Sequence, residues 1–329
     1  MQAKKQAAEF KYVFEQVFTE VSKAVVGQKQ VVHGVLTAIM AGGHILLEGV
    51  PGLGKTLLVN TLSQAINADF SRIQFTPDMM PADIVGTSVL IENADGKHEL
   101  AFQQGPIVAN LVLADEINRA TPKTQSALLE VMQEKQLTVG RSTIVMPEPF
   151  CVMATQNPFE QEGTYPLPEA QLDRFLFKLV VGYPTEQDYR EIIERTTGEQ
   201  TIQVNAVTNG ETINRLRRVV QRVPVSQVAK KYAVRIVMAT QPNSEYASKL
   251  VNSYVRLGAS PRGIQGLMLA AKVRALLNER FAVSCDDIRA VAIDVLRHRI
   301  VCSFQAQAEN ITADDVVRDA VENVRTPCF

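Results

Sequence analysis

The sequence is poor in the features that mark several classes of protein. Its 34 Lys and Arg balance 35 Asp and Glu, so the total charge favours neither a nucleic acid nor an anionic membrane surface as partner. The four cysteines lie far apart and in no metal-ligand spacing, which is typical of a reducing compartment, and we expect no disulfide. No apolar run approaches the roughly 18 residues that a membrane span requires, and the charged N-terminus does not resemble a leader. The expected location is therefore the cytoplasm.

A phosphate-binding loop is the most informative feature that is present. Residues 49–56 read Gly-Val-Pro-Gly-Leu-Gly-Lys-Thr, a full match to G-x-x-x-x-G-K-[ST], between strand-like residues 45–47 and apolar residues 57–59. In such a loop, backbone N–H groups surround phosphate oxygens, and the next helix presents its positive N-terminal end to the anion. Lys55 is expected to reach the β and γ phosphates, and Thr56 to reach Mg²⁺. A chance match in a glycine-rich turn is the alternative, and the flanking segments argue against it.

Strand-like and helical patterns alternate through the first part of the chain. Apolar strand-like segments at 111–114 and 150–154 flank a helical pattern at 122–134. An amphipathic helical pattern at 10–21 and a second helical stretch at 28–41 also precede the phosphate loop. Alternation of strands and helices predicts a parallel sheet covered by helices, which is an α/β fold.

The pattern changes at about Thr185, after which only helices are expected. They are predicted at 186–195, 211–223, 226–240, 245–257, 261–278, 285–298 and 312–324. We therefore predict an α/β core over residues 1–184, with N-terminal helices in 1–43 and the sheet and motifs in 44–184. An all-α domain is predicted to follow over residues 185–329.

Polar side chains stand at the ends of two predicted strands. Asp115 and Glu116 follow residues 111–114; beside a phosphate loop, the first can hold Mg²⁺ and the second can polarise an attacking water. Taken alone, the pair would be an ordinary solvated strand end. Asn157 follows the next strand, and ligand-binding residues collect at the carboxyl ends of adjacent parallel strands. We therefore expect Asn157 to bind the γ phosphate or orient water, although an isolated Asn-Pro is usually a turn.

These motifs together resemble the AAA+ ATPases, and within them the MoxR family of the helix-2-insert group. The resemblance extends from about Val25 to Arg262 and is carried by residues 26–28, 72–78, 114–120, 122–125, 154–158 and 160–175. It implies a P-loop AAA+ core with a C-terminal helical lid, and ATP and Mg²⁺ as cofactors. The nucleotide contacts that it implies are Val26, Gly27, Gly49, Val50, Pro51, Gly52, Leu53, Gly54, Lys55, Thr56 and Leu57, with Thr56 and Asp115 on the metal.

The resemblance also assigns roles to side chains outside the loop. Asn157 is similar to the sensor 1 residue, Arg174 to the arginine finger given to a neighbouring subunit, and Arg262 to the sensor 2 arginine that acts on its own chain's nucleotide. A guanidinium stabilises the charge that accumulates on the γ-phosphoryl oxygens. A finger implies a homo-oligomer, expected as a hexameric ring. Arg119 is placed near the nucleotide or at the subunit contact, and either of the other arginines alone would be read as a surface ion-pair residue.

The function that the resemblance implies is ATP hydrolysis at subunit boundaries, driving chaperone-like maturation, assembly or metal insertion of client proteins. A separate von Willebrand factor A domain protein is an expected partner. The alternatives are a helicase-like nucleic-acid motor, a magnesium-chelatase-like subunit and a nucleotide switch with little turnover. A nucleic-acid motor is expected to line its pore with basic residues, and Lys97 and Arg141 are few for that role. The joint presence of Glu116, Asn157 and Arg174 favours turnover over a switch.

Two hairpins are predicted in the core. One spans residues 87–104, with its turn at 93–97, and fits the insertion in the second core helix of this family. The other spans residues 136–146, centred on residues 140–141, and fits the hairpin before sensor 1. Both are expected either to transmit force or to be plain surface hairpins.

Overall fold

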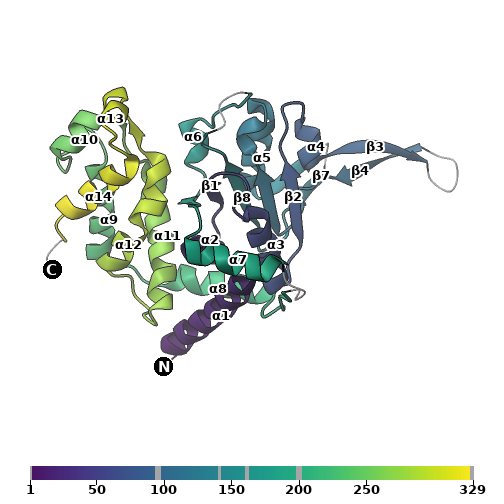
Figure 1. Ribbon diagram of the computed structural model, residues 1–329, viewed down its shortest axis with the longest axis horizontal. Helices are drawn as coiled ribbons and strands as arrows, with labels where there is room; N and C mark the ends of the chain where they lie inside the picture. Colours follow the sequence, from purple (N-terminus) through teal and green to yellow (C-terminus); the bar gives the residue numbers. More distant parts are fainter. Residues whose placement is uncertain (1, 93–97, 140–141, 160–162, 198–201, 327–329) are drawn as a thin grey trace.

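The computed structural model describes residues 2–92, 98–139, 142–159, 163–197 and 202–326. It confirms an α/β core followed by a helical lid (Figure 1). The core contains a sheet of five parallel strands in the order β2-β5-β8-β1-β9. Their bounds are β1 Ile45–Glu48, β2 Phe70–Gln74, β5 Leu111–Asp115, β8 Cys151–Gln156 and β9 Phe177–Val180. The three central strands match the predicted ones, whereas the edge strands β2 and β9 were not predicted.

Alternating side chains of the central strands divide the core into two apolar layers. In β5, Leu111 and Leu113 pack with the helices α1 (Gln2–Ala24), α2 (Lys29–Ala41) and α3 (Lys55–Ala65). Val112 and Ala114 point the other way and pack with α4 (Pro81–Val85) and α5 (Pro122–Glu134). The sheet is therefore covered on both faces, as parallel sheets require. Since all five strands run the same way, their carboxyl ends share one edge of the sheet and their amino ends the opposite edge.

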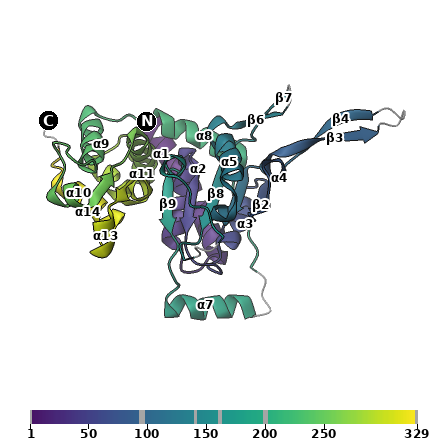
Figure 2. The same cartoon turned by 90° about the horizontal axis from the view of Figure 1, so that it is seen from above.

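Both predicted hairpins are present in the core. β3 (Gly86–Glu92) pairs antiparallel with β4 (His98–Gln104), and β6 (Gln136–Val139) pairs with β7 (Ser142–Val145). Figure 2 shows the first hairpin reaching far from the sheet. The predicted turn residues 93–97 and 140–141, including Lys97 and Arg141, lie outside the described residues.

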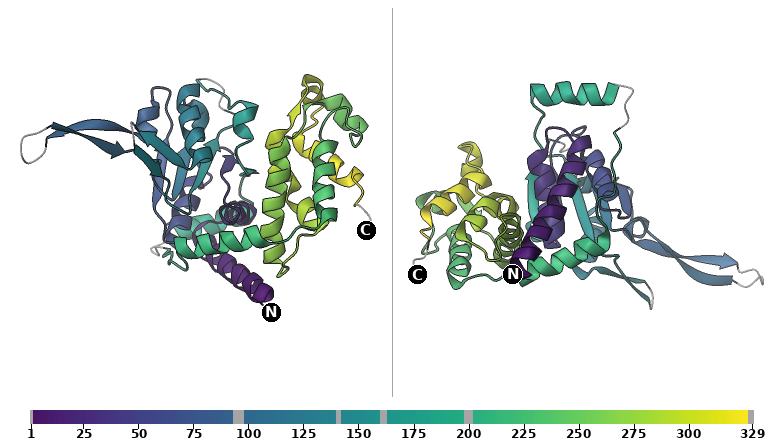
Figure 3. Two further views of the ribbon diagram at one scale, coloured as in Figure 1. Left: turned by 180° about the vertical axis from the view of Figure 1, so that it is seen from behind. Right: turned by 90° about the horizontal axis from the view of Figure 1, so that it is seen from below.

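Most of the second half of the chain is helical, as predicted. The helices are α7 Glu186–Thr197, α8 Gly210–Arg222, α9 Gln227–Ala239, α10 Lys249–Tyr254, α11 Pro261–Leu277, α12 Cys285–Leu296, α13 Phe304–Ala308 and α14 Ala313–Asn323. The helix predicted at 245–257 is shorter, because β10 (Val255–Leu257) leaves it and pairs with β11 (Val301–Cys302). α13 was not predicted. Figures 2 and 3 show α7 standing apart from the sheet.

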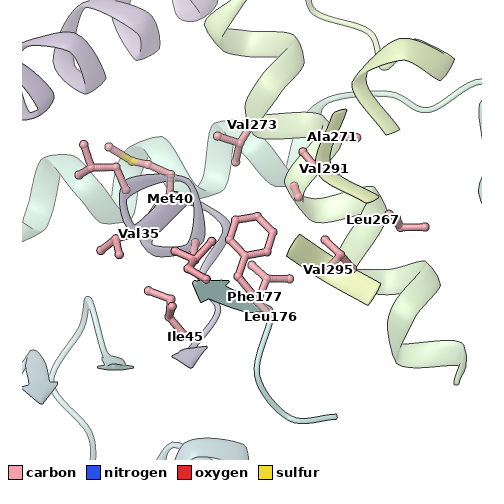
Figure 4. Close-up of a cluster of buried hydrophobic side chains, with 14 of the residues drawn as sticks. Val35, Met40, Ile45, Leu176, Phe177, Leu267, Ala271, Val273, Val291 and Val295 are labelled. Atoms are coloured by element: carbon pink, nitrogen blue, oxygen red, sulfur yellow. The ribbon is translucent and has the colours of Figure 1, made fainter. Parts of the chain in front are cut away.

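A continuous apolar contact fixes the lid against the β9 edge of the core. Figure 4 shows Val35, Met40, Ile45, Leu176 and Phe177 of the core beside Leu267, Ala271, Val273, Val291 and Val295 of the lid. Gly266 of α11 allows the close approach, because a Cβ there would lie 3.3 Å from Cδ1 of Leu176 in the core.

Two further elements cross between the predicted domains. α1 packs on α2 and α3 of the core and on α11 of the lid, and its Lys11 pairs with Glu279 at 2.7 Å. α8 packs on α2, where Nε of Arg217 donates to the carbonyl oxygen of Ile39 at 2.7 Å. The boundary at residue 184 stays a prediction. Among the described residues, no helix has both the length and the apolar character needed to cross a membrane.

Candidate active site

The phosphate loop joins β1 to α3, and its backbone requires glycine at three positions. Gly52 and Gly54 have φ values of 82° and 75°, in the left-handed region that favours glycine. Gly49 has no room for a side chain, because a Cβ there would lie 2.7 Å from the carbonyl oxygen of Val181. The loop therefore brings the first residue of α3, Lys55, to the carboxyl edge of the sheet.

A cleft of about 240 Å³ lies beside this loop, and we call it the phosphate cleft. The described residues that line it include five with predicted chemical roles: Lys55, Thr56, Asp115, Glu116 and Asn157. The loop residues Pro51, Gly52 and Gly54 also line it. Gly49, Val50, Leu53 and Leu57 belong to the loop or to α3 but are not part of the lining.

Asp115 ends β5, and its carboxylate is held on both oxygens. The hydroxyl of Thr155 donates to Oδ1 at 2.7 Å. Arg72 donates to Oδ2 from Nη2 at 2.7 Å and from Nε at 3.2 Å. The carboxylate is thus fixed in one orientation facing the loop, which suits a metal ligand.

Glu116 follows Asp115 and leaves the strand through an unusual backbone conformation. Its φ is 58°, which an ordinary side chain adopts at a cost, and its N–H donates to the hydroxyl of Thr155 at 2.8 Å. Its side chain is also held: Nε2 of Gln74 donates to Oε2 at 2.9 Å, and Nε of Arg119 pairs with the same oxygen at 3.1 Å. The turn directs the Glu116 carboxylate into the cleft beside Asp115 rather than along the strand.

Lys55 faces these two carboxylates from the loop. Burial lowers its pKa below the usual value, and the charges of Asp115, Glu116 and Glu48 act in the opposite direction. Its Nζ donates to the carbonyl oxygen of Gly49. The ammonium is therefore anchored at the centre of the loop.

Asn157 follows β8 and lines the phosphate cleft. Its Oδ1 accepts from the N–H of Phe159 at 3.2 Å, which orients the amide. β8 lies between β5 and β1 in the sheet, so Asn157 stands between the carboxylates and the phosphate loop. The strand before Asn157 thus predicted its place at the carboxyl edge of the sheet, and its role stays a prediction.

Three residues of the cleft received no role from the sequence: Arg72, Gln74 and Thr155. Arg72 and Gln74 are alternate residues of β2, and Nη2 of Arg72 donates to Oε1 of Gln74 at 2.5 Å. Alternation places them on one face of the strand, and recognition of β2 would have revealed them. Thr155 is 1% exposed and bridges Asp115 to the backbone of Glu116.

The side chains present fit a nucleotide triphosphate with a hard cation. Thr56 and Asp115 offer hydroxyl and carboxylate oxygens from one lining, which is the donor set that Mg²⁺ prefers. The N-terminus of α3 and Lys55 offer positive charge for phosphate oxygens.

Arg174 and Arg262 lie elsewhere, at the amino edge of the same sheet. They line a second pocket of about 230 Å³ together with His44, Asp173 and Arg299, and we call it the arginine pocket. His44 directly precedes β1, and Arg174 shortly precedes β9. This pocket and the phosphate cleft therefore lie beyond opposite ends of β1. At about 3.3 Å per residue, His44 and Gly49 are roughly 16 Å apart along the strand.

This position corrects the expectation that Arg262 acts on its own chain's nucleotide. Arg262 is the second residue of α11, and its Nη1 lies 4.0 Å from Oδ2 of Asp173, at the amino edge. The lid packs against β9 and the N-terminal helices, so it holds Arg262 away from the loop of the same chain. Arg174 is anchored nearby: its Nη1 donates to the carbonyl oxygen of Leu129 in α5 at 2.7 Å.

The predicted contacts Val26 and Gly27 lie in the turn between α1 and α2. Gly27 has a φ of 75°, and a Cβ there would lie 2.8 Å from the carboxyl group of Asp188 in α7. Nε2 of Gln28 donates to the carbonyl oxygen of Gly182 at 2.9 Å. This turn therefore packs against the start of the α7 segment and is not part of the lining of the phosphate cleft.

Comparison with family models agrees with this architecture. Residues 44–177 match the ATPase family associated with various cellular activities (AAA), and residues 247–320 match the AAA lid domain. The first match contains the strands β1 to β8 and the first residue of β9, and the second begins just before α10.

Similar proteins cover almost the whole chain. Chaperone MoxR1 of Mycobacterium tuberculosis is 45% identical over 316 residues, which are 96% of this chain and 83% of that protein. Protein MoxR of Methylorubrum extorquens is 31% identical over 94% of this chain and 93% of its own length. A crystal structure from Cytophaga hutchinsonii has a TM-score of 0.91 and 42% identity, and covers 99% of this chain and 98% of that one. The chain therefore belongs to the MoxR family of AAA+ ATPases.

Proposed function

We propose that this protein hydrolyses ATP at the boundary between two copies of itself. One observation carries the proposal: the groups predicted to bind phosphate and activate water line one cleft, while Arg174 and Arg262 lie beyond the opposite edge of the sheet. Of the described residues that line the arginine pocket, Lys135, Arg174, Arg262 and Arg299 are cationic and Asp173 is the single carboxylate. A pocket with this excess of positive charge suits the phosphates of a neighbouring subunit.

Within the cleft, the loop amides and Lys55 bind the β and γ phosphates, and Thr56 and Asp115 hold the metal. When bound, Mg²⁺ neutralises phosphate charge. Thr155 and Arg72 keep the Asp115 carboxylate oriented, so the metal ligand needs no rearrangement when nucleotide binds.

Glu116 orients the attacking water and accepts its proton at a carboxylate oxygen. Among the residues that the structure describes, Gln74 and Arg119 hold its Oε2 and none is recorded on Oε1, which is the oxygen that takes the water. Asn157 helps to place the water and the γ phosphate through its amide. Because the chain turns at Glu116, the carboxylate that accepts the proton and the Asp115 carboxylate that holds the metal are two separate groups in the cleft.

Arg174 completes the site from the next subunit, and Arg262 assists from the same pocket. Negative charge on the γ-phosphoryl oxygens increases in the transition state, and a planar guanidinium with several donors stabilises it. The arrangement requires a closed or chain-like homo-oligomer, which we propose to be a hexameric ring located in the cytoplasm.

A mixing experiment tests this proposal. Lys55→Ala subunits cannot bind phosphate but retain Arg174, whereas Arg174→Ala subunits retain the cleft but lack the finger. Each variant alone should hydrolyse ATP poorly, and a mixture allowed to assemble should recover activity measured by phosphate release. A mixture that assembles, as checked by light scattering, and stays as inactive as its components would overturn the shared site.

We further propose that hydrolysis drives chaperone-like maturation, assembly or metal insertion of client proteins. The name of Chaperone MoxR1 supports the chaperone role. The β3–β4 and β6–β7 hairpins are the proposed moving parts, and a separate von Willebrand factor A domain protein is the proposed partner. Glu116→Gln, which should hold ATP without turnover, is the suitable bait for capturing a client. If captured material is nucleic acid and DNA stimulates hydrolysis, the client role is wrong.

A further inference from the structure

The backbone that carries Arg174 is held by a side chain of the lid. Arg299 lies in η2 (Arg297–Arg299), the short turn after α12. Its Nη2 donates to the carbonyl oxygens of Phe175 at 2.6 Å and Asp173 at 3.3 Å, and its Nη1 donates to that of Leu176 at 3.3 Å. The carbonyl groups on both sides of Arg174 therefore take their orientation from the lid.

An ion pair strengthens this contact. Oδ1 of Asp173 accepts from Nε of Arg299 at 2.9 Å, and Oδ2 accepts from the hydroxyl of Ser260 at 2.8 Å, just before α11. The Arg299 side chain is only 3% exposed. His298 adds a hydrogen bond from Nε2 to the carbonyl oxygen of Phe175 at 3.0 Å. Because separation would leave a buried charge unpaired, the Arg174 segment and the lid move together.

The lid has no comparable contact with the phosphate cleft. Among the residues that the structure describes, those lining the cleft all precede α7, whereas Arg262, Gln265 and Arg299 of the lid line the arginine pocket. The lid of a chain is thus connected to the edge that faces the neighbouring subunit's nucleotide.

We propose that Arg299 is a positioning residue that fixes the Arg174 finger for the neighbouring subunit, and so couples the lid of one subunit to the active site of the next. This rests on the proposed function, in which Arg174 acts across a subunit boundary. A displacement of the lid moves the carbonyl groups that Arg299 holds, and with them the finger. Nucleotide bound by the neighbouring subunit contacts Arg174, and it therefore acts through Arg299 on the lid of this chain.

The geometry requires arginine at position 299 in particular. Its guanidinium offers five N–H donors in a fixed plane, and here they serve Asp173, Phe175, Leu176 and the carbonyl oxygen of Val295. A lysine would keep the charge but offer three donors at one point, so Arg299→Lys loosens the segment while leaving a cation beside Asp173.

The test extends the mixture of Lys55→Ala donor subunits with Arg174→Ala acceptor subunits. Only the donor's finger and the acceptor's cleft then form complete sites. Arg299→Lys is placed first in the donor and then, separately, in the acceptor. Arg297→Lys is the matched control, because Arg297 is a neighbouring lid arginine, 14% exposed, that pairs within the lid with Asp314 at 2.8 Å. ATP turnover and nucleotide affinity are both measured.

In the donor, Arg299→Lys should lower kcat at least tenfold without changing the acceptor's nucleotide affinity. In the acceptor, which has no finger, it should change little, and Arg297→Lys should change little in either subunit. An equal loss from both placements, or no loss from the donor, overturns the positioning role. Failure of the parent mixture to regain activity would instead overturn the proposed function.

A milder variant keeps the test decisive if Arg299→Lys does not fold. Ser260→Ala removes one bond to Asp173 and one helix cap, and Ser303→Ala removes a comparable cap, at α13, away from the finger. Ser260→Ala in the donor should lower kcat two- to fivefold, with no effect from Ser303→Ala. Equal behaviour of the two serine variants contradicts the proposal.

Discussion

The phosphate cleft and the arginine pocket, at opposite edges of one sheet, are built in different ways. The cleft is assembled from a loop and strand ends within the core, and its side chains are held by bonds between neighbouring strands of one sheet, such as that from Thr155 to Asp115. The pocket is assembled from core and lid, and its central bonds join residues more than a hundred positions apart. The cleft is thus a binding site built by the core alone, whereas the geometry of the pocket depends on how the lid is placed against the core.

Removal of the finger should have the largest effect on hydrolysis. Arg174→Ala should lower kcat about 10³-fold in the assembled protein, because the transition-state charge loses its guanidinium. Nucleotide affinity of the unassembled chain should stay unchanged, since Arg174 does not line its own cleft. Arg318→Ala, at an exposed lid position, is the control in a phosphate-release assay. A variant with normal turnover would show that the pocket has no part in the chemistry.

Loss of the proton acceptor, Glu116, should have the second-largest effect on hydrolysis. Glu116→Gln should lower kcat about 10²-fold or more while ATP still binds, because the amide keeps the shape but cannot accept the proton. Equilibrium binding of a fluorescent ATP analogue and steady-state hydrolysis separate the two effects. The exposed Glu322→Gln serves as control. If binding fails together with turnover, Glu116 has a structural role in the cleft instead.

Thr155→Val should have a smaller effect, confined to the cleft. The change removes the hydroxyl that donates to Asp115 and accepts from the N–H of Glu116, at a site that is 1% exposed. An unsatisfied buried donor costs about 1–3 kcal/mol, so kcat should fall about tenfold. Thr155→Ser keeps the hydroxyl and should restore most of the activity. Equal activities of the Val and Ser variants would show that this bridge is irrelevant.

The smallest expected effect is on the pH dependence of folding stability, through His44 at the amino edge of the sheet. Burial lowers the pKa of His44 to about 4. Its Nδ1 accepts from the N–H of Val152 at 3.0 Å, and its Nε2 donates to the carbonyl oxygen of Met132 at 3.0 Å, an arrangement that requires the neutral ring.

The unfolded chain, with a His pKa of about 6.5, binds the proton first as pH falls. The stability that His44 contributes is therefore complete above pH 6.5 and is lost progressively down to about pH 4. The slope that His44 alone contributes should be at most about 1.4 kcal/mol per pH unit. His44→Gln should flatten the measured slope in denaturant unfolding, with the parts due to His33 and His298 remaining, because burial also lowers the pKa of these two histidines. Identical slopes would contradict the assignment.

The same contrast explains what the sequence could predict. The loop and the strand-end residues stand at short, fixed distances from apolar strands, so the cleft followed from local patterns. Arg72 and Gln74 were missed because β2 is an edge strand in which only Ile73 is buried, and its pattern is too weak to read. β9 was missed for another reason: it has four residues, and Lys178 interrupts its short apolar run.

The arginine pocket depends on tertiary placement that no local pattern encodes. The sequence run Arg297-His298-Arg299 gives no sign that Arg299 reaches the core while Arg297 pairs within the lid. The side on which Arg262 acts depends on how the lid packs against β9, which was therefore predicted wrongly. The helix predicted at 245–257 failed similarly, since pairing of Val255 with Cys302 overrides local helical preference.

If Arg174 acts in the neighbouring subunit as proposed, the placement of cleft and finger at opposite edges of the sheet also determines how many complete active sites an assembly contains. In that assembly each subunit gives one finger and receives one, so the contact is head-to-tail and self-propagating rather than two-fold symmetric. In an open arc, one end subunit always has a cleft without a finger, and the other end has a finger without a cleft. Closure of the ring makes the number of complete sites equal the number of subunits, so specific activity should rise with concentration until the ring closes and then stay constant.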